Sequence, residues 1–279
     1  MKQIESPKIA AWNSRIGLVE EYCYPRSPAE TGQLHVHGEI QICFSLDFPG
    51  RYAYRGKVHE VPVRAVSILD SWEPHASSDP CDRHAPSHYI VMYVNPAAFR
   101  NAAGAPPDAD LGKPIRIGGA IVKSFGALYR ALAAAGSMLE QDERYQDFAR
   151  MVIRSEGGRT MAQPADRALQ RVRDYIAAHA TQPIALRDVA AQADLSRWHL
   201  TRAFRRRFGV PPHRFQTLMR IDLARRLLAN RRANAEVAHA VGFADESHFI
   251  RWFKRVVRTT PARYRAERPI SGMRMLPSW

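Results

Sequence analysis

Apolar residues in the last third of the chain recur at helical spacing in two separate stretches. In the first stretch, Leu200, Phe204 and Phe208 fall on one stripe of a predicted helix. In the second stretch, the corresponding stripe consists of Phe249, Phe253 and Val256. Arginines and other polar residues occupy the opposite face of both helices, so each helix is predicted to bury one side and expose the other.

The two stretches are copies of one unit. Residues 189–190 match residues 237–238 at an offset of 48. Five positions further on match at an offset of 49: Leu200, Arg202, Phe204, Pro212 and Phe215 correspond to Phe249, Arg251, Phe253, Pro261 and Tyr264. Each copy contains a short apolar helix, a tight turn and a basic second helix, joined by a long helix predicted at residues 211–228. An internal repeat of this kind is one structural unit built twice, and the unit has the outline of a helix-turn-helix.

The turn residues support this interpretation. Gly242 adopts positive φ without steric cost, and Asp194 is of a residue type that visits the left-handed region. Ser196 and Asp245 follow where a second helix needs a side-chain acceptor at its N-cap. We therefore expect both turns to lead into capped recognition helices.

The N-terminal half has a strand pattern. From Ile40 to Leu46, apolar residues alternate with Gln41, Cys43 and Ser45, as expected for a half-buried strand. Further strands are predicted at residues 52–54, 58–63, 66–69 and 89–94. Many short strands at this spacing favour a small β-barrel or jelly roll. After Pro96 the pattern becomes helical, and it predicts two helices packed on the barrel.

Charge is distributed unevenly. The chain has 279 residues and a net charge of +14. Residues 164–268 contain 22 Lys and Arg against 9 Asp and Glu, whereas the rest of the chain is nearly balanced. A basic helix-turn-helix pair binds DNA phosphates. The N-terminus lacks a signal-peptide core and the three cysteines form no CxxC motif, so a cytoplasmic protein, nucleoid-associated when bound to DNA, is expected.

The second copy, VAHAVGFADESHFIRWFKRVVRTTPARYR, resembles the signature of the AraC/XylS family of bacterial transcription regulators, and LSRWHLTRAFRRRFG resembles the family's other half. The likeness covers about the last hundred residues. Arg258 departs from the pattern, because the family usually has Gly there, as at Gly209. A left-handed helix end would cost a non-Gly residue about 1 kcal/mol, which leaves open how the second recognition helix ends.

The resemblance implies that two recognition helices enter adjacent major grooves about 34 Å apart. The residues that it makes candidates for contacts with base edges are Trp198, Thr201, Arg202, Ser247, His248 and Arg251. The candidates for phosphate contacts are Arg197, Arg205, Arg206, Lys254 and Arg255. Glu246 has two possible roles: its carboxylate would either accept a hydrogen bond from cytosine N4 or stabilise the N-terminus of the helix through its negative charge.

The segment from His35 to His75 resembles the cupin-like sensor domain that often precedes AraC-type DNA-binding domains. Candidate effector-pocket residues are His35, His37, Tyr52, Trp72 and His75. A His-x-His strand segment can chelate a metal, but Glu39 follows His37 too closely for the cupin ligand pattern and no second cupin motif surrounds His75. No metal, no other cofactor and no catalytic residue is therefore expected.

These patterns predict an α+β protein: a cupin-like β-barrel with following helices, then an all-α domain of two helix-turn-helix units joined by a long helix. The expected divisions are a sensing and dimerisation domain at 1–155, a linker at 156–165, the DNA-binding domain at 166–268 and a tail at 269–279. The predicted function is a sequence-specific regulator, in the first instance an activator, with promoter DNA, a small-molecule effector, a second copy of itself and RNA polymerase as partners, and no membrane. Two alternatives stay open: a metal-dependent cupin enzyme with an ancillary DNA-binding domain, and an effector-independent DNA binder.

Overall fold

The computed structural model describes residues 6–107, 109, 111–134, 137–154 and 164–266. The expected linker therefore lies outside the described residues except for positions 164 and 165, and the expected tail lies outside them entirely. None of the described helices is long and apolar enough to span a membrane.

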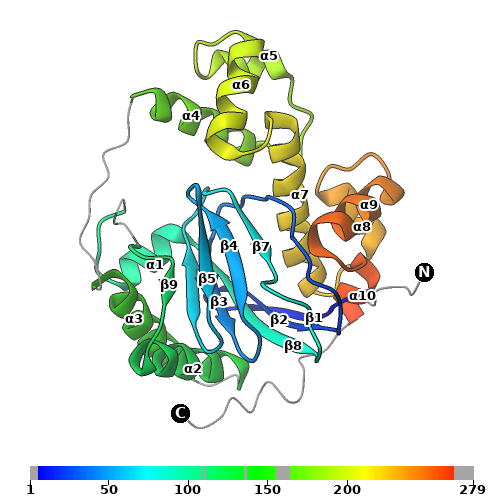
Figure 1. The fold of residues 1–279 in the computed structure, drawn as a ribbon. Helices are drawn as coiled ribbons and strands as arrows, with labels where there is room; N and C mark the ends of the chain where they lie inside the picture. The colour runs from blue at the N-terminus through cyan, green and yellow to red at the C-terminus, as the bar shows by residue number, and fades with distance from the viewer. Residues whose placement is uncertain (1–5, 108, 110, 135–136, 155–163, 267–279) are drawn as a thin grey trace.

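The N-terminal half consists of two antiparallel sheets followed by helices (Figure 1). One sheet has six strands in the order β1-β2-β8-β3-β6-β9, and the other has three in the order β5-β4-β7. The strands are β1 Lys8–Ser14, β2 Gly17–Tyr24, β3 Ile40–Ser45, β4 Gly50–Tyr54, β5 Lys57–Val61, β6 Val66–Leu69, β7 His75–Ser78, β8 Ser87–Val94 and β9 Ile115–Arg116. The expected strand-rich N-terminal domain followed by helices is confirmed.

The central strand β3 corrects one expectation. All six of its residues are buried, so the prediction of a half-buried strand is wrong. Ile42 and Phe44 belong to the core shared with the following helices, whereas Gln41, Cys43 and Ser45 point to the opposite face, where they line a cavity. Its polar alternation therefore reflects an interior polar cavity, because β3 lies between β8 and β6 and is covered on both faces.

Three helices cover one face of the six-stranded sheet. They are α1 Pro96–Ala102, α2 Gly119–Ala133 and α3 Met138–Arg154. Phe125 and Leu128 of α2 and Phe148 of α3 are fully buried in the core that also includes Ile42 and Met92 of the sheet. The helical spacing seen in the sequence thus corresponds to the faces of α2 and α3 that pack on the sheet.

The C-terminal half is entirely helical. Its helices are α4 Pro164–Ala178, α5 Leu186–Ala191, α6 Arg197–Phe208, α7 Pro212–Ala229, α8 Asn234–Ala240, α9 Glu246–Val257 and α10 Pro261–Ala266. The pairs α5–α6 and α8–α9 are the two helix-turn-helix units, and α7 joins them as predicted. The apolar stripe of α9 differs from the prediction at one residue, because Val257, and not Val256, is buried beside Phe249 and Phe253.

The turns have the chemistry that the sequence indicated. Asp194 and Gly242 both have positive φ, at 53° and 84°. A Cβ at Gly242 would lie 2.1 Å from the carbonyl oxygen of Thr181, so that position excludes a side chain as well. The Ser196 hydroxyl accepts from the His199 amide at 3.3 Å, and the Asp245 carboxylate accepts from the His248 amide at 2.7 Å, so both recognition helices are capped.

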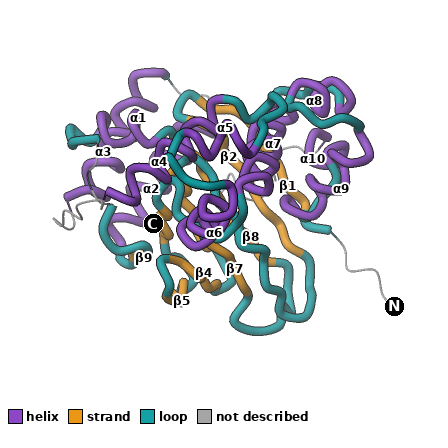
Figure 2. The backbone as a smooth tube through the Cα atoms, turned by 90° about the horizontal axis from the view of Figure 1, so that it is seen from above, coloured by secondary structure: helices purple, strands orange, loops and turns teal. Residues whose placement is uncertain are grey.

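The two halves share a hydrophobic core. Ile9 and Leu18 of the sheet, together with Val91 and Tyr93, belong to the same buried cluster as residues of α7–α10 such as Phe253. Figure 1 shows α1–α3 on one side of the sheets and α7–α10 on the other, and Figure 2 shows α4–α6 in front of the strands when the molecule is seen from above. The sheet is therefore packed between two helical layers.

Candidate nucleic-acid interface and effector cavity

Helix α6 presents the first set of predicted DNA contacts. Five of its side chains surround one surface depression: Trp198, Thr201, Arg202, Arg205 and Arg206. Trp198 is 63% exposed, so its ring is accessible to a partner. The Arg202 guanidinium lies over its ring at 5.5 Å, so the two side chains hold one another in place.

The Thr201 hydroxyl donates to the Arg197 carbonyl oxygen at 2.8 Å. Its hydrogen-bonding capacity is therefore partly used within the helix, while its methyl group remains available for an apolar contact such as a thymine methyl. Arg197, at the start of α6, is exposed.

Helix α9 presents the second set, and its members differ in what they already contact. Ser247, Arg251 and Lys254 are exposed on the outer face of the helix. The Trp252 indole donates to His248 Nε2 at 2.8 Å, so that this ring nitrogen is already used within the helix. Arg255 donates to the Gln33 side chain of the N-terminal half at 3.2 Å, which directs it toward the sensor side.

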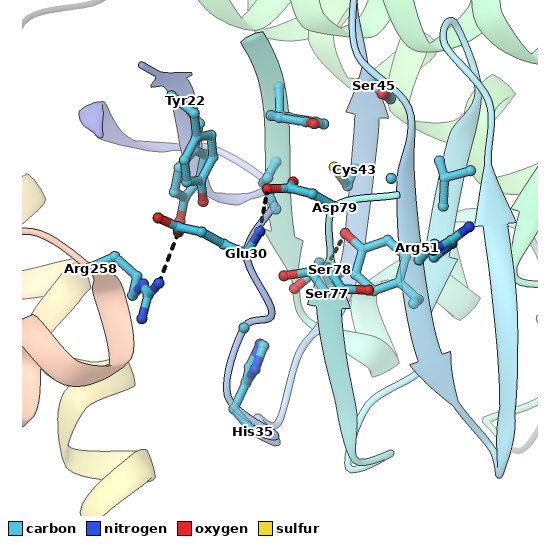
Figure 3. Close-up of a pocket in the computed structure, with 18 of the residues that line it drawn as sticks. Tyr22, Glu30, His35, Cys43, Ser45, Arg51, Ser77, Ser78, Asp79 and Arg258 are labelled. Carbon is cyan, nitrogen blue, oxygen red and sulfur yellow. Dashed lines mark hydrogen bonds and ion pairs between the residues drawn. The ribbon is translucent and has the colours of Figure 1, made fainter. Parts of the chain in front are cut away.

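A cavity of about 180 Å³ lies between the sheets and the end of α9 (Figure 3). Its walls come from β2, β3, β4, β7 and β8, from the loop between β2 and β3 (residues 25–39), and from Val256, Val257 and Arg258. Arg258 donates to the Glu30 carboxylate at 2.9 Å, and Glu30 in turn donates its backbone amide to Asp79 at 3.0 Å. The cavity is thus lined by residues from both halves of the chain.

The lining is aromatic and polar. Tyr22, Tyr52 and Tyr93 contribute hydroxyl groups, and burial raises the pKa of each well above its ordinary value, so all three are donors at neutral pH. Burial likewise raises the pKa of the Cys43 thiol to about 11, which keeps it protonated and unreactive. Convergent polar groups on aromatic walls are typical of a small-molecule site.

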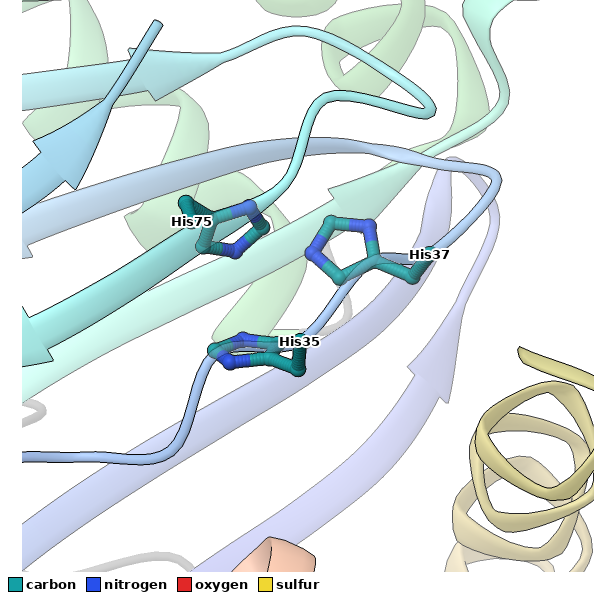
Figure 4. A group of neighbouring side chains, drawn as sticks. All are labelled: His35, His37 and His75. Atoms are coloured by element: carbon teal, nitrogen blue, oxygen red, sulfur yellow. The ribbon is translucent and has the colours of Figure 1, made fainter. Parts of the chain in front are cut away.

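The three histidines singled out in the sequence come together beside this cavity (Figure 4). His35 and His75 pair their backbones at 2.9 and 3.0 Å, and the ring of His37 lies 4.9 Å from that of His75. Burial lowers the pKa of all three imidazoles, because the charged form loses its solvation.

The expected effector residues therefore divide into two groups. His35 and Tyr52 line the cavity, and His37 and His75 adjoin it through the histidine cluster. Trp72 lies elsewhere: it stacks on Phe215 of α7 with ring centroids 5.7 Å apart, and it forms part of the contact between the two halves.

The cavity residues that sequence reasoning missed are those contributed by distant segments. Glu30 and Tyr89 carry no local signal, because neither lies in a pattern that distinguishes a cavity wall from a surface. Arg258 did carry a signal, since it replaces the usual Gly of the repeat, and its side chain reaches the cavity wall.

Comparison with known proteins shows which kind of domain the C-terminal half contains. A family model described as a helix-turn-helix domain matches residues 189–267. The chain is 30% identical over 92 residues to the probable transcriptional regulator LumQ of Photobacterium leiognathi and 38% identical over 80 residues to the regulator MtrA of Neisseria gonorrhoeae. Residues 189–267 form an AraC-type helix-turn-helix domain. The chain spans only 37% and 27% of the lengths of these two relatives.

Two further comparisons extend beyond the AraC-type domain. The activator RhaS of Klebsiella pneumoniae is 24% identical over 251 residues, which cover 85% of this chain and 88% of RhaS. Crystal structures of ToxT from Vibrio cholerae, one in an apo form and one with a bound unsaturated fatty acid, superpose with TM-scores of 0.66 and 0.64 at 13% identity, and they cover 92% and 91% of this chain. The arrangement of an N-terminal sheet domain before the AraC-type domain is therefore a fold that ToxT shares.

Proposed function

We propose that the protein is a sequence-specific DNA-binding transcription regulator whose N-terminal half senses a small molecule. The observation that carries this proposal is the pair of capped recognition helices in a strongly basic AraC-type domain, each with an exposed polar face. Its cellular partners are promoter DNA and, if it activates, RNA polymerase. The proposed division is sensing and dimerisation at 1–155, a linker at 156–165 and DNA binding at 166–268.

The exposed residues of the two helices take different roles in this proposal. Trp198, Arg202 and Arg251 are the strongest candidates for base contacts, because they project from the outer faces of α6 and α9. Thr201, Ser247 and His248 complete the base-facing set. Arg197, Arg205, Arg206 and Lys254 are assigned to phosphates, and Arg255 joins them if it leaves Gln33 on DNA binding.

The test separates base reading from phosphate contact. Preferred sequences are first selected from a random pool with the full-length protein, and affinities are then measured at matched salt on the selected site and on random DNA. Arg251→Ala should weaken binding to the selected site by about 1–3 kcal/mol and to random DNA much less, because bidentate Arg–guanine contacts discriminate among bases.

Arg206→Ala is the matched control on the other helix. It should weaken both DNAs alike and reduce the log–log salt slope by about one unit, as expected for the loss of one phosphate contact. Equal losses on both DNAs for Arg251→Ala would show that Arg251 holds a phosphate. Failure of the selection to enrich any sequence would favour an effector-independent DNA binder with little sequence preference instead.

The cavity supports the sensing part of the proposal. A ligand there would contact the sheets and Arg258 at once, so its binding free energy would depend on how the two halves are placed. Its volume of about 180 Å³ is below the roughly 300 Å³ at which sites for drug-sized ligands begin, so a small metabolite is the expected effector. The unsaturated fatty acid bound by ToxT shows that a protein with this fold binds a small molecule, but it does not define the ligand here.

A thermal-shift screen of metabolites against the full-length protein tests this part. A true effector should raise the melting temperature of the wild type in proportion to the logarithm of its concentration. Tyr52→Phe, which removes one hydroxyl from the cavity wall, should reduce that shift, whereas Tyr175→Phe in the helical half should leave it unchanged. An effector that raises the melting temperature equally in both variants binds outside the cavity.

A further inference from the structure

The histidine cluster beside the cavity consists of three residues that the sequence marked as effector-pocket candidates and not as metal ligands. One ring nitrogen from each of His35, His37 and His75 lies within 4.8 Å of the others. His35 and His37 belong to the β2–β3 loop and His75 begins β7, so residues some 40 positions apart in the chain are brought to one point (Figure 4).

Hydrogen bonds to main-chain carbonyls determine which ring nitrogen of each histidine is available. Nδ1 of His35 lies 2.9 Å from the Gln33 carbonyl oxygen, Nδ1 of His37 lies 3.0 Å from that of Glu39, and Nδ1 of His75 lies 2.9 Å from that of Glu73. A carbonyl oxygen only accepts, so Nδ1 must carry the proton in all three rings. In the neutral rings, each Nε2 then carries a lone pair, and Nε2 of His37 lies 3.3 Å from the Gln41 side-chain oxygen, a contact that a metal ion would replace.

The same arrangement recurs around metal-binding histidines, which donate the second ring N–H to a carbonyl or carboxylate and are thereby held in the ligating orientation. Here all three rings have that support from the main chain. His75 Nε2 is fully buried and has no hydrogen-bond partner among the described residues. A buried acceptor left unpaired is costly, and a bound cation would satisfy it.

We propose that Nε2 of His35, His37 and His75 together bind a divalent transition metal. Three neutral imidazoles without a carboxylate suit zinc, copper or nickel and not magnesium or calcium. The carboxylate of Glu39 is not one of the ligands: one of its oxygens pairs with Arg226 of α7, and the other lies 3.9 Å from Nδ1 of His37, the ring nitrogen that does not bind the metal. This explains why the cupin ligand pattern is incomplete and yet three ligands remain, the number that zinc uses in sites with one open position.

The fit requires only a small adjustment. Tetrahedral zinc with bonds of about 2.0–2.1 Å places its nitrogens about 3.3 Å apart, so ring nitrogens that lie up to 4.8 Å apart would approach one another by up to about 1.5 Å. The backbone pairing of His35 with His75 holds the main chains of two ligands together, and rotation of the side chains would supply the approach. Since His35 also lines the cavity, the metal would lie at the edge of the space where a small molecule would bind.

The experiment uses tag-free, full-length protein stripped with a chelator and then titrated with Co²⁺ and Zn²⁺. The expected result is one equivalent of tightly bound metal, with visible Co²⁺ absorption bands of a four-coordinate site that has three nitrogen ligands and one solvent ligand. Zn²⁺ should displace the Co²⁺ and raise the melting temperature. Absence of metal binding by the wild type at millimolar concentration would overturn the proposal.

Variants locate the site. His35→Gln and His37→Gln should each lower the affinity by about 100-fold or more, since loss of a ligand exceeds the 10–100-fold loss caused by changing a group that only orients one. His84→Gln, at an exposed histidine outside the cluster, is the control and should bind metal as the wild type does. Retention of full binding by both cluster variants would overturn the proposal. If either variant fails to fold by circular dichroism, the wild-type Co²⁺ spectrum decides: six-coordinate or absent bands contradict it.

Discussion

At the scale of single residues, Arg258 combines a conformational penalty with an interaction. It ends α9 in the left-handed region with φ of 69°, the same value that Gly209 has at the end of α6. Its amide donates to the Lys254 carbonyl oxygen at 3.0 Å, which closes the end of the helix. The repeat therefore keeps its exit geometry without the usual glycine, and the added side chain reaches Glu30 of the β2–β3 loop.

Arg258→Gly and Arg258→Ala separate these two effects. Both remove the ion pair with Glu30, but only Ala retains the strain of a left-handed Cβ-bearing residue, worth about 1–2 kcal/mol. Part of that difference is offset because Gly increases the entropy of the unfolded chain by about 0.4–1 kcal/mol. We expect the Gly variant to be more stable than the Ala variant by about 0.5–1 kcal/mol in urea denaturation. Equal stabilities would mean that the helix end relaxes out of the left-handed region when the ion pair is lost.

At the scale of elements, the sequence was most informative where local chemistry decides the structure. The two helix-turn-helix units follow from apolar spacing, from Asp194 and Gly242 in the turns, and from the acceptors Ser196 and Asp245, all of which act within a few residues. The strand at β3 was found for the same reason. Its burial was misjudged, because alternation cannot distinguish a polar face in water from a polar face lining a cavity.

The β2–β3 loop shows what local patterns cannot predict. Its residues 25–39 include few regular elements, yet Gln33 contacts Arg214 of α7 and Arg255 of α9, and Leu34 packs where a Cβ at Gly209 would lie. The same loop carries His35 and His37. These contacts join residues about 180 to 220 positions apart, so only the tertiary fold reveals that the loop links the cavity, the histidine cluster and the ends of both recognition helices.

At the scale of the whole molecule, opposite charges join the two halves. Four glutamates of the N-terminal half pair with arginines of the AraC-type domain: Glu20 with Arg225, Glu30 with Arg258, Glu39 with Arg226, and Glu73 with Arg207. The excess positive charge of the C-terminal half is thus divided between two surfaces. One surface faces outward from α6 and α9, and the other faces the sheets. A change in either half is transmitted through these pairs and through the shared apolar core.

The pair at the centre of this contact should dominate its energetics. Glu20 is fully buried, and its carboxylate accepts from Arg225 of α7, from Tyr264 of α10 and from Tyr22 at 2.5 Å. Glu20→Gln leaves the buried Arg225 guanidinium without its main counter-charge, which typically destabilises a protein by about 3–5 kcal/mol. The neighbouring Asp222 lies 3.4 Å from Arg225, so we expect a loss near the lower end of that range.

Glu30→Gln is the matched control, because it removes a carboxylate from a pair whose side chains are 25% and 42% exposed. Solvent screening limits such a pair to about 0–1 kcal/mol. Both variants and the wild type should be unfolded in urea while the fluorescence of the tryptophans and the helical circular dichroism are followed together. The wild type should unfold in one transition, since its two halves share a core, and Glu20→Gln should lower the midpoint far more than Glu30→Gln. Equal, small losses of unfolding free energy in both variants would show that apolar packing alone holds the sheets against α7 and α10. The buried charges would then orient the two halves without stabilising their contact.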